Sequence, residues 1–175
     1  MNAPGHPDAI VCEPMTAATR PHAQRLLGGF LAADAHYRAS AVHYGDGGAE
    51  ALERALDLFV ARPEIGFVWL ARVGETVAGA CVVCYGISTS LGGVVAKLDD
   101  VTVDPDRHGQ GVGTAMLTAL TRHLRQRGVG RIDTACHREN VAAWRFYLRH
   151  GFRPLDEERI ALLINESSAS QGPTT

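Results

Sequence analysis

Three glycines at alternate positions, Gly109, Gly111 and Gly113, close the run V-D-P-D-R-H-G-Q-G-V-G. A short β-type run ending at Pro105 precedes them, and a helix with periodic apolar residues follows. Because glycine has no Cβ, the backbone can turn tightly there and bring several N–H groups close to an anion. The helix start adds unpaired N–H donors and the positive end of its dipole. The pattern predicts a cradle for a pyrophosphate, and so a nucleotide-bearing cofactor.

Two familiar glycine fingerprints do not fit this loop. A dinucleotide fingerprint beginning at Gly109 needs a small residue at Thr114, and one beginning at Gly111 needs it at Met116. A P-loop needs a lysine directly after its last glycine, and the only lysine of the chain is Lys97. Kinase or nucleotide-hydrolysing chemistry is therefore not expected.

A second motif follows the loop, N-V-A-A-W-R-F-Y-L-R-H-G-F over residues 140–152. Together the two motifs resemble the GNAT superfamily of N-acetyltransferases, which transfer an acetyl group from acetyl-CoA to an amine. The resemblance covers about residues 67–164. It implies that Asn140 contacts CoA, that Tyr147 is the catalytic tyrosine, and that Gly151 and Phe152 turn the chain into the next strand.

The resemblance implies acetyl-CoA as cosubstrate, with its pyrophosphate in the glycine loop and its pantetheine arm paired with the strand at residues 98–103. His108 departs from the family, which usually has arginine or glutamine there, but backbone N–H donors are expected to make most of the hydrogen bonds to the pyrophosphate. The resemblance assigns acetyl-CoA contacts to Val101, Val103, His108, Gly109, Gln110, Gly111, Val112, Gly113, Thr114, Asn140 and Tyr147.

Acetylation of an amine requires a neutral nucleophile, and an alkylammonium has a pKa near 10.4. Removing its proton at pH 7 costs about 4.6 kcal/mol, so the site needs a base, a water relay or a way to capture the neutral amine. Asp99 and Asp100 are the candidate bases, and because strand neighbours face opposite ways, the register decides which one points into a pocket. The alternative is that one aspartate is exposed and the other caps a backbone group.

The stretches Y-G-I-S-T-S-L-G-G and A-K-L-D-D-V-T-V look like the spermidine/spermine and thialysine acetyltransferase branch, which carries an acidic pair in the same strand. Asp99 replaces the glutamate usual at the first position of that pair. The resemblance implies a small cationic amine as acceptor, which aspartates in the pocket would attract.

Departure of the CoA thiolate benefits from a proton donor, and Tyr147 suits this role because a phenol stays protonated at pH 7. The alternative is a core tyrosine that shares a helical stripe with Ala143 and Phe146. Asn140 lies about two helical turns earlier, so an unbroken helix would present both side chains on one side. We expect the amine to attack acetyl-CoA directly in a ternary complex, without a covalent enzyme intermediate. Cys136 lies near the expected cleft, but a lone cysteine there is more typical of a buried packing residue.

The 175 residues, 46% of them hydrophobic, predict one domain over residues 9–165, with disordered segments at 1–8 and 166–175. A formal net charge of −2 gives no pull toward nucleic acid or membrane. With no apolar stretch of about 18 residues and no apolar signal core, the chain is expected in the cytoplasm.

A homodimer is implied only by the resemblance. Cys81 and Cys84 are three apart on an expected strand and so face opposite ways, which argues against a shared metal.

The expected architecture is α/β, a GNAT-type mixed and mostly antiparallel sheet of six to seven strands flanked by about four helices. Strands are predicted at residues 9–15, 67–73, 77–84, 94–103, 131–135 and 159–164. Helices are predicted from Pro21, before Pro63, at 111–127 and at 141–150. Loops at 36–48 and 86–93 are expected to shape the acceptor pocket.

Three other functions stay open at this point. An enzyme acting on a protein amino terminus or lysine differs mainly in how open the acceptor groove is. A non-catalytic acyl-CoA-binding sensor is the second, and the presence of Tyr147 and Asn140 argues against it. A plain structural domain is the third, and failure to bind acetyl-CoA would favour it.

Overall fold

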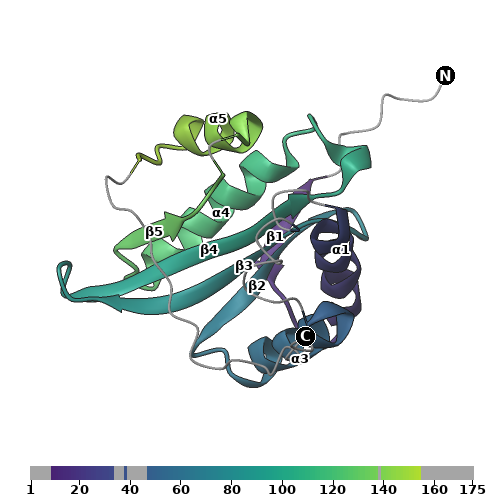
Figure 1. Cartoon of the computed structure of the whole chain (residues 1–175), viewed down its shortest axis with the longest axis horizontal. Coiled ribbons are helices and arrows are strands. Elements are labelled where there is room, and N and C mark those ends of the chain that lie inside the picture. The colour runs from purple at the N-terminus through teal and green to yellow at the C-terminus, as the bar shows by residue number, and fades with distance from the viewer. Residues whose placement is uncertain (1–8, 34–37, 39–46, 138, 155–175) are drawn as a thin grey trace, which may run out of the picture.

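The computed structural model describes residues 9–33, 38, 47–137 and 139–154, which form one sheet with helices on both faces (Figure 1). The sheet has five strands in the order β1-β2-β3-β4-β5. They are β1 Ile10–Pro14, β2 Gly66–Val73, β3 Thr76–Ser88, β4 Gly93–Val103 and β5 Arg131–Thr134. Neighbours from β1 to β4 are antiparallel, whereas β4 and β5 are parallel. The predicted mixed, mostly antiparallel sheet is confirmed.

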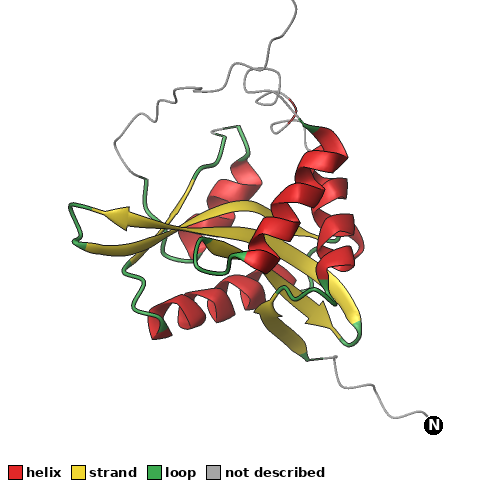
Figure 2. Cartoon of the chain, turned by 90° about the horizontal axis from the view of Figure 1, so that it is seen from below, coloured by secondary structure: helices red, strands yellow, loops and turns green. Residues whose placement is uncertain are grey.

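Helices cover both faces of the sheet, as the view from below in Figure 2 shows. On one face lie α1 Arg20–Ala33 and α3 Gly48–Ala61, and on the other α4 Val112–Gln126 and α5 Val141–Arg149. A short 3-10 helix, η1 Pro105–Arg107, connects β4 to the glycine loop. This arrangement places the end of β4, the glycine loop and the start of α4 next to one another in the chain.

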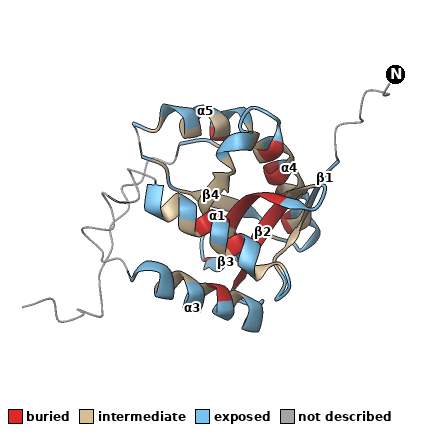
Figure 3. Ribbon diagram, turned by 90° about the vertical axis from the view of Figure 1, so that its right-hand side faces the viewer, coloured by how far each residue is buried: buried red, intermediate tan, exposed pale blue. Residues whose placement is uncertain are grey.

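The core has two halves separated by the sheet, because alternate strand residues face opposite ways. Trp69, Cys81 and Leu98 pack beneath α4, while Val68 and Leu70 pack beneath α1 and α3. Figure 3 shows the buried residues concentrated in β2 and β3 and on the inner side of α4. The central strands β2 and β3 therefore contribute buried residues to both halves of the core.

A β-bulge interrupts the pairing of β3 with β4. Val82 stands opposite Asp99, but Ala80 stands opposite Thr102, so Asp100 and the residue after it share one partner position. Asp100 has a φ of 49°, and it is the non-glycine residue with positive φ in the described part of the chain. Such a bulge locally breaks the alternation of side chains along a strand. The break in alternation falls between Asp100 and Val101, which share Cys81 as partner, so the step from Asp99 to Asp100 lies before it.

The predicted elements match the structure within a few residues, with two exceptions. β3 continues to Ser88, so the predicted loop at 86–93 is reduced to a turn at the tip of a long hairpin. Five strands, not six to seven, are present in the described residues, and the predicted strand at 159–164 lies outside them. The predicted disordered ends and most of the loop at 36–48 also lie outside the described residues.

Candidate functional site

The edge of β4 opens where β5 leaves it. The two strands pair only from Val95 opposite Arg131 to Leu98 opposite Thr134. Beyond Leu98, β4 continues to Val103 with no described strand on that side, while the chain after Thr134 turns away toward α5. The five residues from Asp99 to Val103 therefore have no described strand paired on this side, although the Val103 carbonyl is engaged with His108. Val101 and Val103, predicted to contact acetyl-CoA, lie on this segment.

The glycine loop lies directly after this edge and ends at the start of α4. Gly109 and Gly111 have φ values of 74° and 81°, which favour glycine, and a Cβ at either position would meet no atom within 4 Å. Gly111 is the N-cap residue of α4 and supplies no side-chain cap. The first intrahelical bond runs from the Ala115 N–H to the Gly111 carbonyl at 2.9 Å. The N–H groups of Val112, Gly113 and Thr114 therefore have no partner within the helix.

Side chains of the loop are occupied with the backbone around them. The His108 Nε2 lies 2.9 Å from the Val103 carbonyl, and the Gln110 side chain donates to the Asp106 carbonyl at 2.9 Å. Thr114 Oγ1 lies 3.4 Å from the His150 Nε2. The loop therefore presents mainly backbone N–H groups to an anion, and His108 fixes the loop to the end of β4.

The two aspartates at the opening differ in their partners. Asp99 forms an ion pair with Lys97, with 2.8 Å between Oδ2 and Nζ. No hydrogen bond or ion pair joins the Asp100 carboxylate to another described residue. Burial raises the pKa of Asp100, the charge of Asp99 raises it further, and Lys97 opposes both effects. Asp100 is thus the half-buried carboxylate with spare acceptor capacity.

Tyr147 reaches the same region from α5. Only 8% of it is exposed, and its ring packs on Phe146 and Phe152 with centroid distances of 5.4 and 5.2 Å. Burial raises the pKa of Tyr147 to about 12, partly offset by its hydrogen bond to the Thr134 side chain. Thr134 in turn donates to the Leu98 carbonyl at 2.9 Å, at the last pair before the opening. The phenol is therefore held, protonated, where β4 and β5 separate.

Asn140 lies at the start of α5 but is not part of the helix. Its side-chain oxygen accepts from the Ala143 N–H at 3.1 Å, and its φ and ψ of −80° and 69° are those of a cap. Asn140 is thus the N-cap directly before the predicted helix, and its sharing one side with Tyr147 stays a prediction. Among the described residues, no hydrogen bond to the Asn140 side-chain nitrogen is present.

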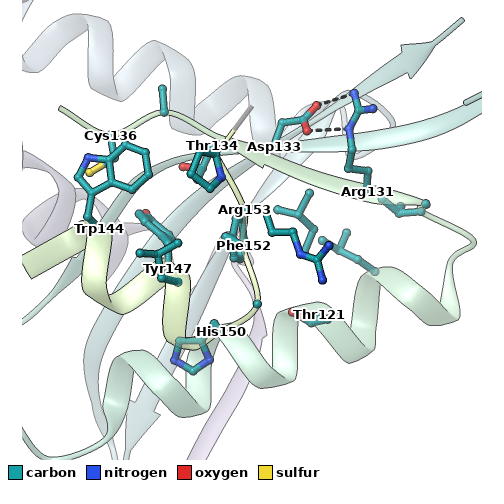
Figure 4. A pocket seen from close by; sticks show the side chains of 18 of the residues that line it. Thr121, Arg131, Asp133, Thr134, Cys136, Trp144, Tyr147, His150, Phe152 and Arg153 are labelled. Atoms are coloured by element: carbon teal, nitrogen blue, oxygen red, sulfur yellow. Dashed lines mark hydrogen bonds and ion pairs between the residues drawn. The ribbon is translucent and has the colours of Figure 1, made fainter. Parts of the chain in front are cut away.

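A cavity of about 590 Å³ lies beside Tyr147, between β5, α5 and the second half of α4. In Figure 4, Tyr147 and Trp144 project from α5 toward Thr134 and Cys136, and the Arg131–Asp133 ion pair stands on β5. The glycine loop and the two aspartates do not line this cavity. Burial raises the pKa of Cys136, so this thiol is not activated.

The structure thus places Asp99 and Asp100 just past the last β4–β5 pair, the glycine loop after the end of β4, and Tyr147 beside Thr134 of that pair. Two residues of this region had no predicted role, Lys97 and Thr134. Lys97 could have been found from the sequence, because residues two apart on a strand share a face and Lys97 precedes Asp99 by two. Thr134 had no such signal, because its contact with Tyr147 depends on the packing of α5.

Comparison with known proteins identifies the family. The sequence profile of the acetyltransferase (GNAT) family matches residues 33–152. The chain belongs to this family. Its members use acetyl-CoA, which agrees with the cradle and the open strand edge. In the described residues of this GNAT protein, no helix is long and apolar enough to cross a membrane.

Two curated proteins are similar to part of this chain. An uncharacterized N-acetyltransferase of Methanocaldococcus jannaschii is 33% identical over 91 residues, which cover 52% of this chain and 40% of that protein. A mycothiol acetyltransferase of Thermobispora bispora is 31% identical over 87 residues, covering 50% of this chain and 30% of that protein. The matched segments span less than half the length of these relatives.

Solved structures share the fold. AAC(6′)-Iy in complex with the bisubstrate analogue CoA-S-monomethyl-acetylneamine superposes with a TM-score of 0.67 at 13% identity, covering 90% of this chain and 98% of the other. At this identity the likeness concerns the fold alone.

Proposed function

We propose that this GNAT protein transfers the acetyl group of acetyl-CoA to the primary amine of a small cationic molecule. The observation that carries the proposal is the opening beyond Leu98, where an unpaired strand edge leads into the uncapped start of α4. An extended polar chain can pair with the edge while its diphosphate meets the three free N–H groups. The empty space around Gly109 and Gly111 leaves room for that approach.

The chain's own residues divide the binding of acetyl-CoA between backbone and side chains. Val101 and Val103 lie on the open edge, where the Val103 carbonyl is engaged with His108, and Val112, Gly113 and Thr114 offer N–H donors. Asn140 contributes its free side-chain nitrogen from the start of α5. Bound there, acetyl-CoA would supply an activated thioester carbonyl.

The acidic pair then accepts the proton that the acceptor ammonium must lose before it can attack. An alkylammonium is attracted to the carboxylates of Asp99 and Asp100 and loses a proton to one of them. Capture in a partly buried site also excludes competing water. The attack is direct, because the described part of the chain shows no activated nucleophile near the opening.

Tyr147 acts on the sulfur side. Since burial raises the pKa of Tyr147 to about 12, the phenol is fully protonated at pH 7 and stabilises developing thiolate charge chiefly by donating a hydrogen bond. A proton can follow once the carbon–sulfur bond has broken. The raised value makes full transfer harder than for an exposed phenol.

The proposal is tested with the full chain by two measurements, calorimetric binding of CoA and release of free thiol from acetyl-CoA. The amine panel contains polyamines, thialysine, lysine, aminoglycosides and short peptides. We expect amine-dependent thiol release, and we expect Tyr147→Phe to lower kcat by about 10²-fold while leaving CoA affinity within about twofold. Turnover on the peptides alone would instead assign a protein acceptor.

Two results would contradict the proposal. Binding of CoA without turnover on any amine would favour a sensor. A chain that folds but binds neither CoA nor acetyl-CoA would leave only a structural role.

A further inference from the structure

The only lysine of the chain lies inside the acidic cluster at the opening. Lys97 and Asp99 are two apart on β4, share a face of the strand and are joined by the 2.8 Å ion pair. Cys84 of β3 stands opposite Lys97 on the same face. The ammonium group therefore lies where the proposed function expects the cation of the acceptor to approach.

Asp100 is set apart from Asp99 by its backbone. The bulge gives it the left-handed φ of 49°, a conformation that costs most residues about 1 to 2 kcal/mol but that aspartate and asparagine tolerate best. The bulge lies one residue beyond Asp99, which is the first residue past the last β4–β5 pair. A strained residue with an unpaired carboxylate at the mouth of an opening is a candidate for function.

We propose that Lys97 is a positioning residue that holds Asp99 in an ion pair and so leaves Asp100 as the carboxylate that takes the proton of the acceptor amine. This inference rests on the proposed function. Two carboxylates and one ammonium leave one uncompensated negative charge, which matches an acceptor with a single cationic amine at this end.

The proton and bond balance is complete with the groups present. The acceptor ammonium gives one proton to the Asp100 carboxylate, and its lone pair forms the carbon–nitrogen bond as the carbon–sulfur bond breaks. The nitrogen loses its second proton on becoming an amide, and the departing thiolate gains one. No oxidant or further reactant is needed.

The charged groups around Asp100 predict opposite effects for its two neighbours. Asp99 raises the pKa of Asp100 and Lys97 lowers it, both from the same strand. From β3, Cys84 is near all three groups, and burial raises the pKa of this thiol so that it stays uncharged at neutral pH. From α1, which packs on β3 and β4, Arg25 is engaged with Asp104 at 3.6 Å and with the Val77 carbonyl.

The test measures kcat/KM against pH for the full chain, using an amine that the wild type acetylates. Activity should fall on acidification as the base becomes protonated. Lys97→Met should move this acid limb to higher pH, Asp99→Asn should move it to lower pH, and Lys97→Arg should restore the wild-type position. Asp100→Asn, whose asparagine tolerates the same backbone, should lower kcat by about 10²-fold or more, against less than tenfold for Asp99→Asn.

A second readout does not depend on turnover. The carboxyl titration of Asp100, followed by carbon NMR, should shift upward in Lys97→Met and downward in Asp99→Asn. The inference is overturned if Asp99→Asn is the more damaging variant, or if neither neighbour moves the titration of Asp100. Failure of the wild type to acetylate any amine would overturn the proposed function instead, and the NMR titration would still decide the role of Lys97.

Discussion

Replacing Gly111 by alanine separates the stability of α4 from its proposed role as an anion cradle. The chain offers a matched control, because Gly128 lies just beyond the other end of the same helix. Gly111 and Gly128 have φ values of 81° and 74°, and a Cβ at either position would meet no atom within 4 Å. Both substitutions therefore impose the same backbone strain without a clash.

The expected loss in the free energy of unfolding follows from that strain. A non-glycine residue in the left-handed region costs about 1 to 2 kcal/mol, and the stiffer unfolded chain offsets about 0.4 to 1 kcal/mol of this. Each variant should lose about 1 kcal/mol, which lowers Tm by about 2 to 4 °C for a chain of this size. The two losses should be alike within error.

Binding of CoA should respond to only one of the two variants. A methyl group at position 111 stands beside the free N–H groups of Val112 and Gly113, so the diphosphate loses at least one hydrogen bond to charged oxygen, worth about 1.5 to 3 kcal/mol. Calorimetry should show CoA affinity about tenfold to hundredfold weaker for Gly111→Ala and unchanged within about twofold for Gly128→Ala. Equal CoA affinity of the two variants would refute the cradle.

Three further predictions concern the framework that holds the site. Leu120→Ala, at a fully buried position on the inner side of α4, should lose about 2 to 5 kcal/mol in urea unfolding, and Leu58→Ala at a 51% exposed position should lose far less; similar losses would contradict the core described. Burial, and to a smaller extent Arg127, lower the pKa of His123, so on acidification the unfolded chain binds this proton before the folded chain does. The free energy of unfolding should therefore decrease below about pH 6.5, and His123→Gln should remove this part of the decrease. An unchanged pH dependence of stability in His123→Gln would be inconsistent with the prediction. Burial raises the pKa of Cys81 far above that of a free thiol, so peptide mapping after iodoacetamide treatment should find it unmodified until urea unfolds the chain, and labelling of the folded protein would disprove its burial.

The sequence predicted most of the fold because its signals there are local. The alternate glycines, the apolar stripe after them and Pro63 mark element ends by their own backbone preferences. The helices and the first five strands were located in this way. β3 was predicted too short, because its extension to Ser88 depends on pairing with Gly93 and Val94 across the hairpin.

The arrangement of the site depends on contacts that local patterns do not contain. The bulge at Asp100 and Val101, with the positive φ of Asp100, comes from the register between β3 and β4, which no local pattern shows. The capping bond from the Ala143 N–H to the Asn140 side chain was likewise not predicted, because the sequence pattern located only the helix that follows it. The site residues themselves stay predictions until the variants above are measured.

The most direct measurement of the central claim is detection of the acetylated amine itself. The full chain is incubated with acetyl-CoA and a small primary amine, and mass spectrometry follows formation of the N-acetyl product alongside free CoA. We predict stoichiometric formation of the two products with the wild type and a strongly reduced rate with Tyr147→Phe. Release of CoA without any acetylated amine, or no reaction with any acceptor of the panel while CoA still binds, would contradict the claim.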